Sequence, residues 1–153
     1  MDVSSDSRIT AFGLFVEVQE SLTAKVRPNI EASGISYNEF ELLLRLVRSP
    51  QHRLRMSDLA AQTTLTTSGI TRVVDRLQRS GLVERVNCDT DRRGTWAEVT
   101  EAGRELMGAT LPTHLADIEK WFTGLLSEDQ VDTLVDTLRV LRTALRPDAV
   151  AGG

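Results

Sequence analysis

Residues 67–81 read T-S-G-I-T-R-V-V-D-R-L-Q-R-S-G, and this stretch decides the fold. Its apolar residues recur at the spacing of one helical face. They are Ile70, Val73, Val74 and Leu77. The glycine at the end of the stretch, Gly81, is the residue type that most often follows a helix. We therefore expect a helix over residues 67–80 with one buried face.

The opposite face of this helix is polar and mostly basic. It carries Ser68, Arg72, Asp75, Arg76 and Arg79, which fall on one side of the cylinder. A short helix and the turn T-T-L-T-T precede it, and this order is typical of a helix-turn-helix. In that motif the N-terminal side chains of the second helix reach base edges in the major groove of DNA. An amphipathic surface helix with a solvated charged face is the alternative for this segment taken alone.

Two short alternating segments follow the helix. L-V-E-R-V at residues 82–86 and W-A-E-V at residues 96–99 are expected to pair as strands around a hairpin loop at residues 88–94. A two-stranded wing beside a recognition helix can place an arginine in the adjacent minor groove, where the potential is negative. Asp91 stands two residues before Arg93, close enough to hold its guanidinium. A plain solvated turn is the alternative.

Helical patterns occupy most of the remaining chain. Capping boxes are indicated at Ser36 with Glu39 and at Ser127 with Gln130. Ser57 is expected to cap a short helix, and R-L-R around Leu54 to form a very short strand. The expected helices cover residues 8–30, 36–48, 57–62, 100–124 and 127–145. The fold class is therefore mainly α with a small antiparallel β wing.

The first and last helices carry unusually apolar stripes. In the last helix, leucines follow each other at spacings close to a heptad repeat, at Leu134, Leu138, Leu141 and Leu145. An ordinary core helix is the alternative for this pattern. The first helix carries its own stripe, which includes Ile9, Phe12 and Phe15.

The charge of the chain is unevenly distributed. The chain has 153 residues and a formal net charge of −4, which alone argues weakly against a nucleic-acid partner. However, residues 51–95 contain eight of the 18 basic residues and five of the 22 acidic ones. This block carries +3 and the remainder −7, and every base in the block is an arginine, which binds phosphate and guanine edges well.

Several functional classes find no support in the sequence. The single cysteine, Cys88, excludes an intramolecular disulfide, and with His52 and His114 it forms no metal-ligand spacing. We find no phosphate-binding glycine loop, nucleophile motif, signal-like segment or apolar run long enough to span a membrane. We therefore expect a soluble cytoplasmic protein that is not an enzyme and has no cofactor or metal. Cys88 is interpreted as a small structural residue, with redox sensing as the alternative.

The sequence resembles the multiple-antibiotic-resistance (MarR) type of transcriptional regulator. The resemblance rests on L-A-A-Q-T-T-L-T-T-S-G-I-T-R-V-V-D-R-L-Q-R-S-G-L-V-E-R at residues 59–85. It continues in D-T-D-R-R-G at residues 89–94 and V-T-E-A-G at residues 99–103. The order of the flanking helices also agrees, so the resemblance covers nearly the whole chain. One departure is Thr90, where the family often has a proline.

The resemblance implies a winged helix-turn-helix homodimer that binds a pseudo-palindromic operator, with Arg93 in the minor groove and Asp91 as its brace. It divides the chain into an N-terminal dimerisation helix (1–35), the DNA-binding domain (36–100) and C-terminal helices that complete the dimerisation domain (101–153). The expected DNA-binding residues are Thr66, Thr67, Ser68, Thr71, Arg72, Arg76, Arg92 and Arg93. The expected dimer interface consists of Ile9, Phe12, Phe15, Leu134, Leu138, Leu141 and Leu145.

The resemblance also implies a small-molecule effector, often a phenol or an anion, bound between the dimerisation helices and the DNA-binding lobe. The candidate pocket residues, aromatic apart from one cation, are Phe12, Phe15, Phe40, Arg45 and Trp121. The alternative is that the aromatic residues belong to the core and that Arg45 is a surface residue. The sequence thus predicts a DNA-binding regulator, expected to be a repressor. A dimeric helical adaptor or ligand sensor without DNA binding is the alternative.

Overall fold

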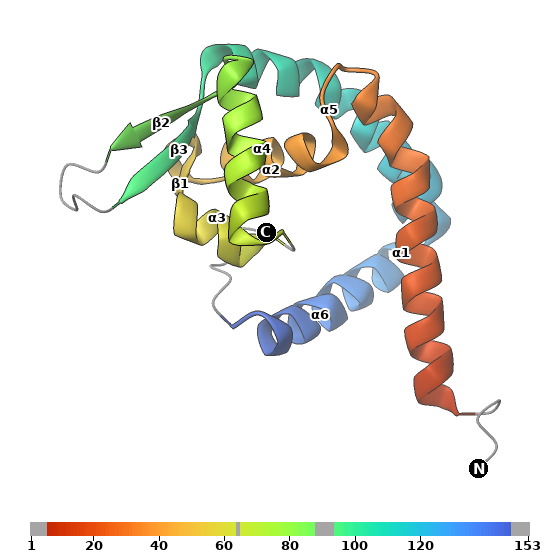
Figure 1. The fold of residues 1–153 in the computed structure, drawn as a ribbon. Coiled ribbons are helices and arrows are strands. Elements are labelled where there is room, and N and C mark those ends of the chain that lie inside the picture. The colour runs from red at the N-terminus through yellow and green to blue at the C-terminus, as the bar shows by residue number, and fades with distance from the viewer. Residues whose placement is uncertain (1–5, 64, 88–93, 148–153) are drawn as a thin grey trace.

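The computed structural model describes residues 6–63, 65–87 and 94–147, and it is mainly helical (Figure 1). The α-helices are α1 (Ser7–Glu31), α2 (Tyr37–Val47), α3 (Met56–Gln62), α4 (Thr67–Arg79), α5 (Glu101–Trp121) and α6 (Glu128–Leu145). The strands are β1 (Arg53–Arg55), β2 (Val83–Asn87) and β3 (Thr95–Val99), and two 3-10 helices are η2 (Pro50–His52) and η3 (Thr123–Leu125). The predicted fold class is confirmed.

The strands form one antiparallel sheet in the order β1-β3-β2. The expected hairpin pairs β2 with β3, and Val86 lies opposite Trp96. The short R-L-R segment becomes the third strand, in which Leu54 lies opposite Ala97 on β3. The sheet therefore joins the segment before the helix-turn-helix to the second strand of the wing.

Local capping explains most of the helix boundaries. Both predicted capping boxes are present, at Ser36 with Glu39 and at Ser127 with Gln130. The prediction for Ser57 is wrong: α3 begins at Met56, directly after β1, and its N-cap makes no side-chain hydrogen bond. The prediction that the fifth helix reaches about Gly124 is also wrong. Phe122 leaves helical geometry, with φ of −135°, and ends α5 at Trp121.

The core lies around α2 and the sheet. Phe40, Leu43 and Leu46 of α2 are fully buried, and they belong to one cluster with residues of α4, β3 and α5. The two terminal helices contribute very little to it. In α1 only Val26 and Ile30, near the C-terminal end, are buried, and α6 buries no residue. Figure 1 shows the N-terminal part of α1 projecting away from the rest of the chain.

Candidate nucleic-acid interface and ligand cavity

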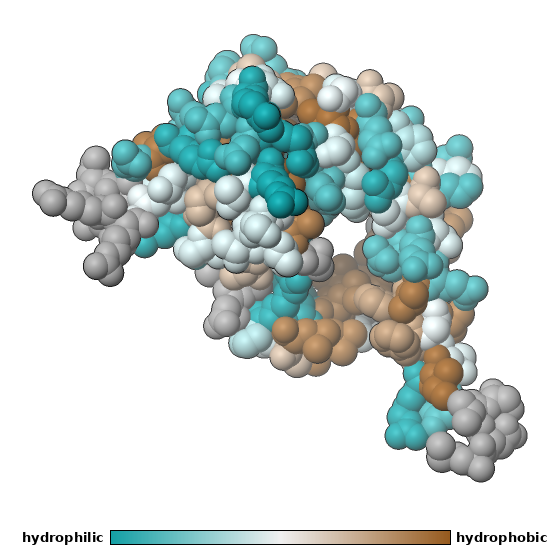
Figure 2. All heavy atoms as spheres, in the orientation of Figure 1, coloured by the Kyte–Doolittle hydropathy of each residue, from teal (hydrophilic) through white to brown (hydrophobic). Residues whose placement is uncertain are grey.

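Helix α4 packs one face into the core and leaves the other in solvent. The apolar residues predicted to be buried are at most 3% exposed, and these are Ile70, Val73, Val74 and Leu77. The residues predicted to contact DNA that fall in the described part are all exposed, and these are Thr66, Thr67, Ser68, Thr71, Arg72 and Arg76. Figure 2 shows the hydrophilic surface that covers α4. The helix is therefore held from behind and presents hydroxyls and guanidinium groups outward.

The N-terminus of α4 is ordered by its own side chains. The hydroxyl oxygen of Thr66 accepts a hydrogen bond from the backbone N–H of Gly69 at 3.1 Å, which caps the helix. The hydroxyl of Thr71 donates to the carbonyl of Thr67 at 3.0 Å. Short hydroxyl side chains at this end allow close approach to a base or a phosphate, as the helix-turn-helix requires.

Two ion pairs hold α4 to its neighbours. Arg85 of β2 lies 2.6 Å from Asp75 and donates to the side chain of Gln78 at 2.7 Å. On the other side of α4, the Nε of Arg76 donates to Glu39 of α2 at 3.0 Å. The sequence placed Asp75 and Arg76 together on a solvated face, and the structure assigns each a partner on a neighbouring element.

Trp96 gathers two arginines at the base of the wing. The guanidinium groups of Arg53 and Arg55 lie 5.0 and 5.3 Å from the centre of its ring, at cation–π distance. Arg53 also lies 3.8 Å from Glu98. Sequence reasoning missed this cluster. The alternation of R-L-R was a signal for it, but the pairing of β1 with β3 supplies the tryptophan.

The tip of the wing lies outside the described residues. Asp91, Arg92, Arg93 and Cys88 fall there. The predicted minor-groove arginine, its brace and the interpretation of the cysteine therefore stay predictions.

The apolar residues predicted to form a dimer interface are accessible in the single chain. In α1, Ile9 is 51% exposed, Phe12 71% and Phe15 53%. Among the predicted leucines of α6, the exposed fraction is 36% at Leu138, 47% at Leu141 and 77% at Leu145. Figure 2 shows hydrophobic residues gathered on both helices. Exposed apolar surface on this scale marks an interaction site.

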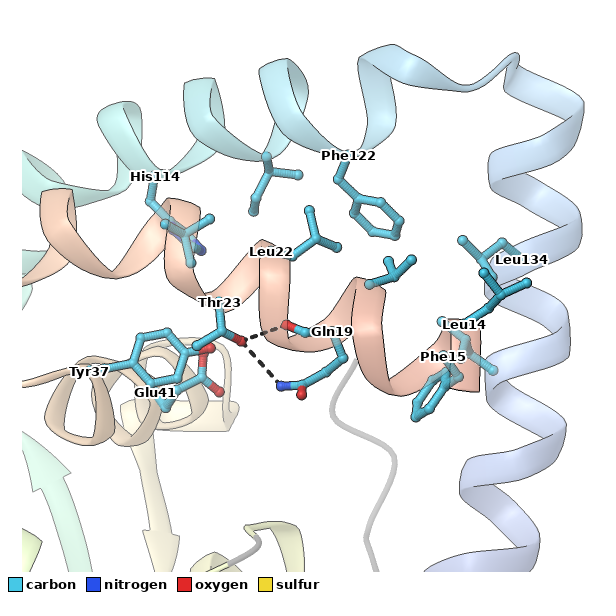
Figure 3. A pocket seen from close by; sticks show the side chains of 14 residues that line it. Leu14, Phe15, Gln19, Leu22, Thr23, Tyr37, Glu41, His114, Phe122 and Leu134 are labelled. Carbon is cyan, nitrogen blue, oxygen red and sulfur yellow. Dashed lines mark hydrogen bonds between the residues drawn. The ribbon is translucent and has the colours of Figure 1, made fainter. Parts of the chain in front are cut away.

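A cavity of about 590 Å³ opens between α1, α2, α5 and α6. One end is apolar and includes Leu14, Phe15 and Leu134, while the other end is polar (Figure 3). The polar groups come from three helices and belong to Gln19, Thr23, Tyr37, Glu41 and His114. Among the described residues that line the cavity, the only formally charged side chain is the carboxylate of Glu41.

His114 and Tyr37, at the polar end of the cavity, are both neutral at pH 7. Burial lowers the pKa of His114 despite the opposing effect of Glu41 and Asp117, so its imidazole is neutral at pH 7. The Nδ1 atom of His114 is buried without a hydrogen-bond partner in the described part of the chain. Burial, together with the charge of Glu41, raises the pKa of Tyr37 and keeps its hydroxyl protonated.

Only part of the predicted effector pocket comes together. Phe15 lines the cavity, but Phe12 does not. Phe40 is fully buried in the core, with its ring edge-on to His114 at 4.7 Å. Arg45 does not line the cavity; it pairs with Glu41 at 3.0 Å and donates to the carbonyl of Gln62 at 3.0 Å. Trp121 lines a neighbouring hollow of about 530 Å³. Of the five predicted pocket residues, only Phe15 therefore lines this cavity, and the effector role of the others stays a prediction.

Within the described residues, no group of three or more His, Cys, Asp or Glu side chains is arranged to hold a metal ion. None of the helices that these residues form combines the length and apolar character needed to cross a lipid bilayer.

Known proteins share this fold and this sequence pattern. A profile of the MarR family matches residues 33–94. AbsC from Streptomyces coelicolor, a MarR family transcriptional regulator, is 32% identical, with 96% of this chain and 99% of AbsC covered and a TM-score of 0.87. Sco3205 from the same organism, crystallised in complex with DNA, is 27% identical with coverage of 94% and 90% and a TM-score of 0.82. The transcriptional regulator MhqR of Bacillus subtilis is 27% identical over 135 residues, which are 88% of this chain and 91% of MhqR.

An exposed, capped, arginine-bearing helix beside a small antiparallel sheet defines a winged helix-turn-helix DNA-binding protein. The similarity to AbsC extends over almost the full length of both chains. The chain belongs to the MarR family of transcriptional regulators. It is a DNA-binding transcriptional regulator, and the resemblance seen in the sequence is confirmed.

Proposed function

We propose that the protein acts as a homodimer that represses transcription from a pseudo-palindromic operator and is released by a small-molecule effector. The observation that carries the dimer is the exposure of apolar side chains on α1 and α6, two helices that bury almost nothing in the single chain. Two α4 helices related by a two-fold axis fit two half-sites of a palindrome. Repression follows because a bound dimer excludes other proteins from the duplex. The protein works in the cytoplasm by binding alone, without catalysis.

The first experiment is a gel shift with the DNA that flanks the protein's own coding region, titrated over a range of salt concentrations. Each phosphate contact is expected to contribute about −0.9 to the slope of log affinity against log salt concentration. A retarded complex with two chains per duplex supports the proposal. Absence of retardation, with a stable dimer in light scattering, would favour a helical ligand sensor without DNA binding.

The cavity supplies the effector site of this proposal. Its apolar walls and neutral hydrogen-bonding groups fit a small phenol, whose ring takes the apolar end and whose hydroxyl pairs with His114 or Tyr37. A carboxylate would find no cation among the described lining residues, and the one carboxylate there, that of Glu41, already pairs with Arg45 outside the lining. Of the two effector chemistries expected from the resemblance, we therefore propose the phenol.

A pair of probes tests this choice. We expect 4-ethylphenol to raise the melting temperature of the protein and weaken its complex with DNA, because a ligand that binds the native state stabilises it. The carboxylate 4-ethylbenzoate, of similar shape, is the control and is expected to do neither. Equal effects of the two probes would show that the cavity does not select by charge.

A further inference from the structure

The carboxylate of Glu39 joins two elements of the DNA-binding lobe. Its Oε2 accepts hydrogen bonds from the backbone N–H and the hydroxyl of Ser36, at 2.7 and 2.8 Å, and so closes the capping box of α2. Its Oε1 accepts from the Nε of Arg76, 37 residues further along the chain, at 3.0 Å. The side chain of Glu39 is 13% exposed and that of Arg76 is 45% exposed. The carboxylate is therefore the fixed member of the pair, and the arginine reaches solvent.

The place of Arg76 on α4 limits what it can touch. It stands nine residues after Thr67, the first residue of the helix, which is about 14 Å along the axis at 1.5 Å per residue. Side chains at the N-terminal end of a recognition helix reach the bases, so Arg76 lies too far along α4 for that role and closer to the phosphates that border the groove. It also lies beside the buried face, toward α2, rather than opposite that face.

The guanidinium of Arg76 keeps a free edge for an anion. Its Nε is taken by Glu39, and within the described part of the chain its two terminal nitrogens donate to no other group. A guanidinium held at one edge presents its remaining N–H groups as a planar fork, which matches the geometry of a phosphate.

We propose that Glu39 is a positioning residue that orients Arg76 toward a phosphate of the DNA backbone, so that Arg76 fixes the register of α4 rather than reading a base. This inference rests on the proposed function, because it requires an operator. It narrows the expected DNA contact of Arg76 to a phosphate. It also assigns Glu39 a part in DNA binding that an acidic residue would not ordinarily suggest.

The charge state of Glu39 agrees with this role. Burial acts to raise its pKa, but the hydrogen bonds from Ser36 and Arg76 outweigh burial and leave the pKa below its usual value. The carboxylate is therefore ionised at neutral pH and holds the arginine by charge as well as by a hydrogen bond. Because the side chain is only 13% exposed and its Oε1 accepts from Arg76, its negative charge lies against the arginine.

One substitution separates the two contacts of Glu39. In Glu39→Gln, the amide oxygen can still accept from Ser36, as the amide oxygen of Gln130 accepts from the backbone N–H of Ser127 at 2.9 Å in the capping box of α6. The second oxygen becomes an NH2 group, which cannot accept from Arg76. The matched control is Glu84→Gln, which removes an exposed carboxylate from β2 without touching Arg76.

The test uses a duplex that the full-length parent protein selects from a random library, and a scrambled duplex of the same length. The measured quantity is the ratio of the two affinities, in which the general effect of a lost negative charge cancels. A phosphate contact that fixes the register of α4 forms fully only on the selected duplex. Glu39→Gln is therefore expected to lower this ratio by roughly threefold to tenfold per protomer, because that contact must then order one more long side chain. Arg76→Ala is expected to reduce the salt slope for the selected duplex by about 0.9 per protomer. In the Arg76→Ala background, Glu39→Gln should change the ratio no further.

Two outcomes would overturn the inference. One is an unchanged ratio for Glu39→Gln. The other is an equal fall in the ratio with and without Arg76, which would mean that Glu39 acts only through the fold of α2. The effect of Glu84→Gln should be the same in both backgrounds, and small.

A second variant keeps the test informative if Glu39→Gln lowers the melting temperature. Arg76→Lys leaves Glu39 and its cap intact and keeps the charge, but it lacks the planar fork. It should lower the affinity ratio while retaining the salt slope, and an unchanged ratio would count against the inference. If the parent protein selects no duplex, the proposed function is wrong, and so is this inference, because it requires an operator. If the parent selects and the variants match it, the inference fails alone.

Discussion

Arg72 and Arg76 stand four residues apart on α4, yet their surroundings separate them. Arg76 is held by Glu39, whereas Arg72 is exposed and makes no hydrogen bond or ion pair within the described residues. Arg72 also lies closer to the N-terminal end of the helix, where side chains reach base edges. The sequence alone treats the two arginines as equivalent members of one polar face.

Arg72→Ala is therefore expected to weaken operator binding by about 1–3 kcal/mol per half-site and to relax specificity at one base position. Folding should be unchanged, because removing an exposed side chain opens no cavity. Arg139→Ala, which removes an exposed arginine from α6, is the control for charge. Binding to a set of singly substituted operators measures both variants. Uniform weakening across that set would assign Arg72 to a phosphate instead of a base.

His114 makes the stability of the protein depend on pH. Burial lowers its pKa in the folded chain below the ordinary value of 6.5. The unfolded chain therefore binds a proton at a higher pH than the folded chain, and the free energy of unfolding falls as the pH drops through 6.5 toward the folded pKa.

The parent protein should lose more stability than His114→Gln between about pH 7.5 and about pH 5.5, the range around the ordinary histidine pKa. Urea unfolding at the two pH values measures the difference. All other ionisable groups are common to the two proteins, so their contributions cancel in the comparison. An equal loss in both proteins would show that His114 takes up its proton as readily in the folded chain as in the unfolded one.

At the scale of elements, helix boundaries were the part of the fold most readable from the sequence. A helix cap involves residues close together in the sequence, so it can be predicted locally. The structure confirms the helix starts predicted at Ser36, Thr100 and Ser127. The misplaced start of α3 has a non-local cause, because β1 pairs with β3 and runs directly into the helix. The R-L-R pattern indicates a strand before Ser57, but no local residue shows that its partner is β3.

The junction of β3 and α5 gives a test of packing between elements. Gly103 lies in the first turn of α5, where an added Cβ would stand 2.3 Å from the carbonyl oxygen of Leu82 and 2.7 Å from a methyl group of Val99. Gly103→Ala should therefore lower the free energy of unfolding by about 1–3 kcal/mol or more, since the crowded atoms include backbone. Gly108, in the same helix, has no atom within 4 Å of its added Cβ.

Gly108→Ala is the matched control, and it should raise the free energy of unfolding by roughly 0.5–1 kcal/mol, because alanine favours a helix interior. Urea denaturation of the two variants against the parent protein measures both effects. If Gly103→Ala were as stable as Gly108→Ala, the close approach of α5 to Leu82 would be wrong.

For the whole molecule, sequence reasoning found the DNA-facing helix but only part of the cavity. The recognition face follows from one helical period within α4, whereas the cavity needs the relative placement of four helices. Phe40 shows why the pocket could not be predicted fully. From the sequence alone, an aromatic residue on the buried face of a helix fits a core and a pocket equally well. The contact of Arg76 with Glu39 spans 37 residues and leaves no mark in local sequence.

The apolar faces of α1 and α6 are left uncovered in a single chain. Leu134, Leu138, Leu141 and Leu145 fall on one side of α6, and none of them is buried. The capping box at Ser127 gives α6 a defined start, but capping contributes only about 1 kcal/mol and does not cover an apolar face. A helix of 18 residues with such a face gains most of its stability from packing, so a partner surface is needed. In the proposed homodimer, a second copy of the chain would offer the same face on α1 and α6, and a two-fold axis would let each copy cover the other.

Leu138→Asp tests that arrangement, because it would place a charge in an apolar interface at a cost of several kcal/mol, on the order of the penalty for burying an unpaired carboxylate. Thr143→Asp adds the same charge to the same helix, but on the side opposite the leucines, where it should stay solvated. Light scattering over a range of concentrations should report a dimer for the parent and for Thr143→Asp, and a monomer for Leu138→Asp. The Leu138→Asp chain should keep its α4 face intact and yet bind an operator far more weakly, since each half-site is then bound independently. If Leu138→Asp forms a folded dimer with the dissociation constant of the parent, the dimer interface does not include this face of α6.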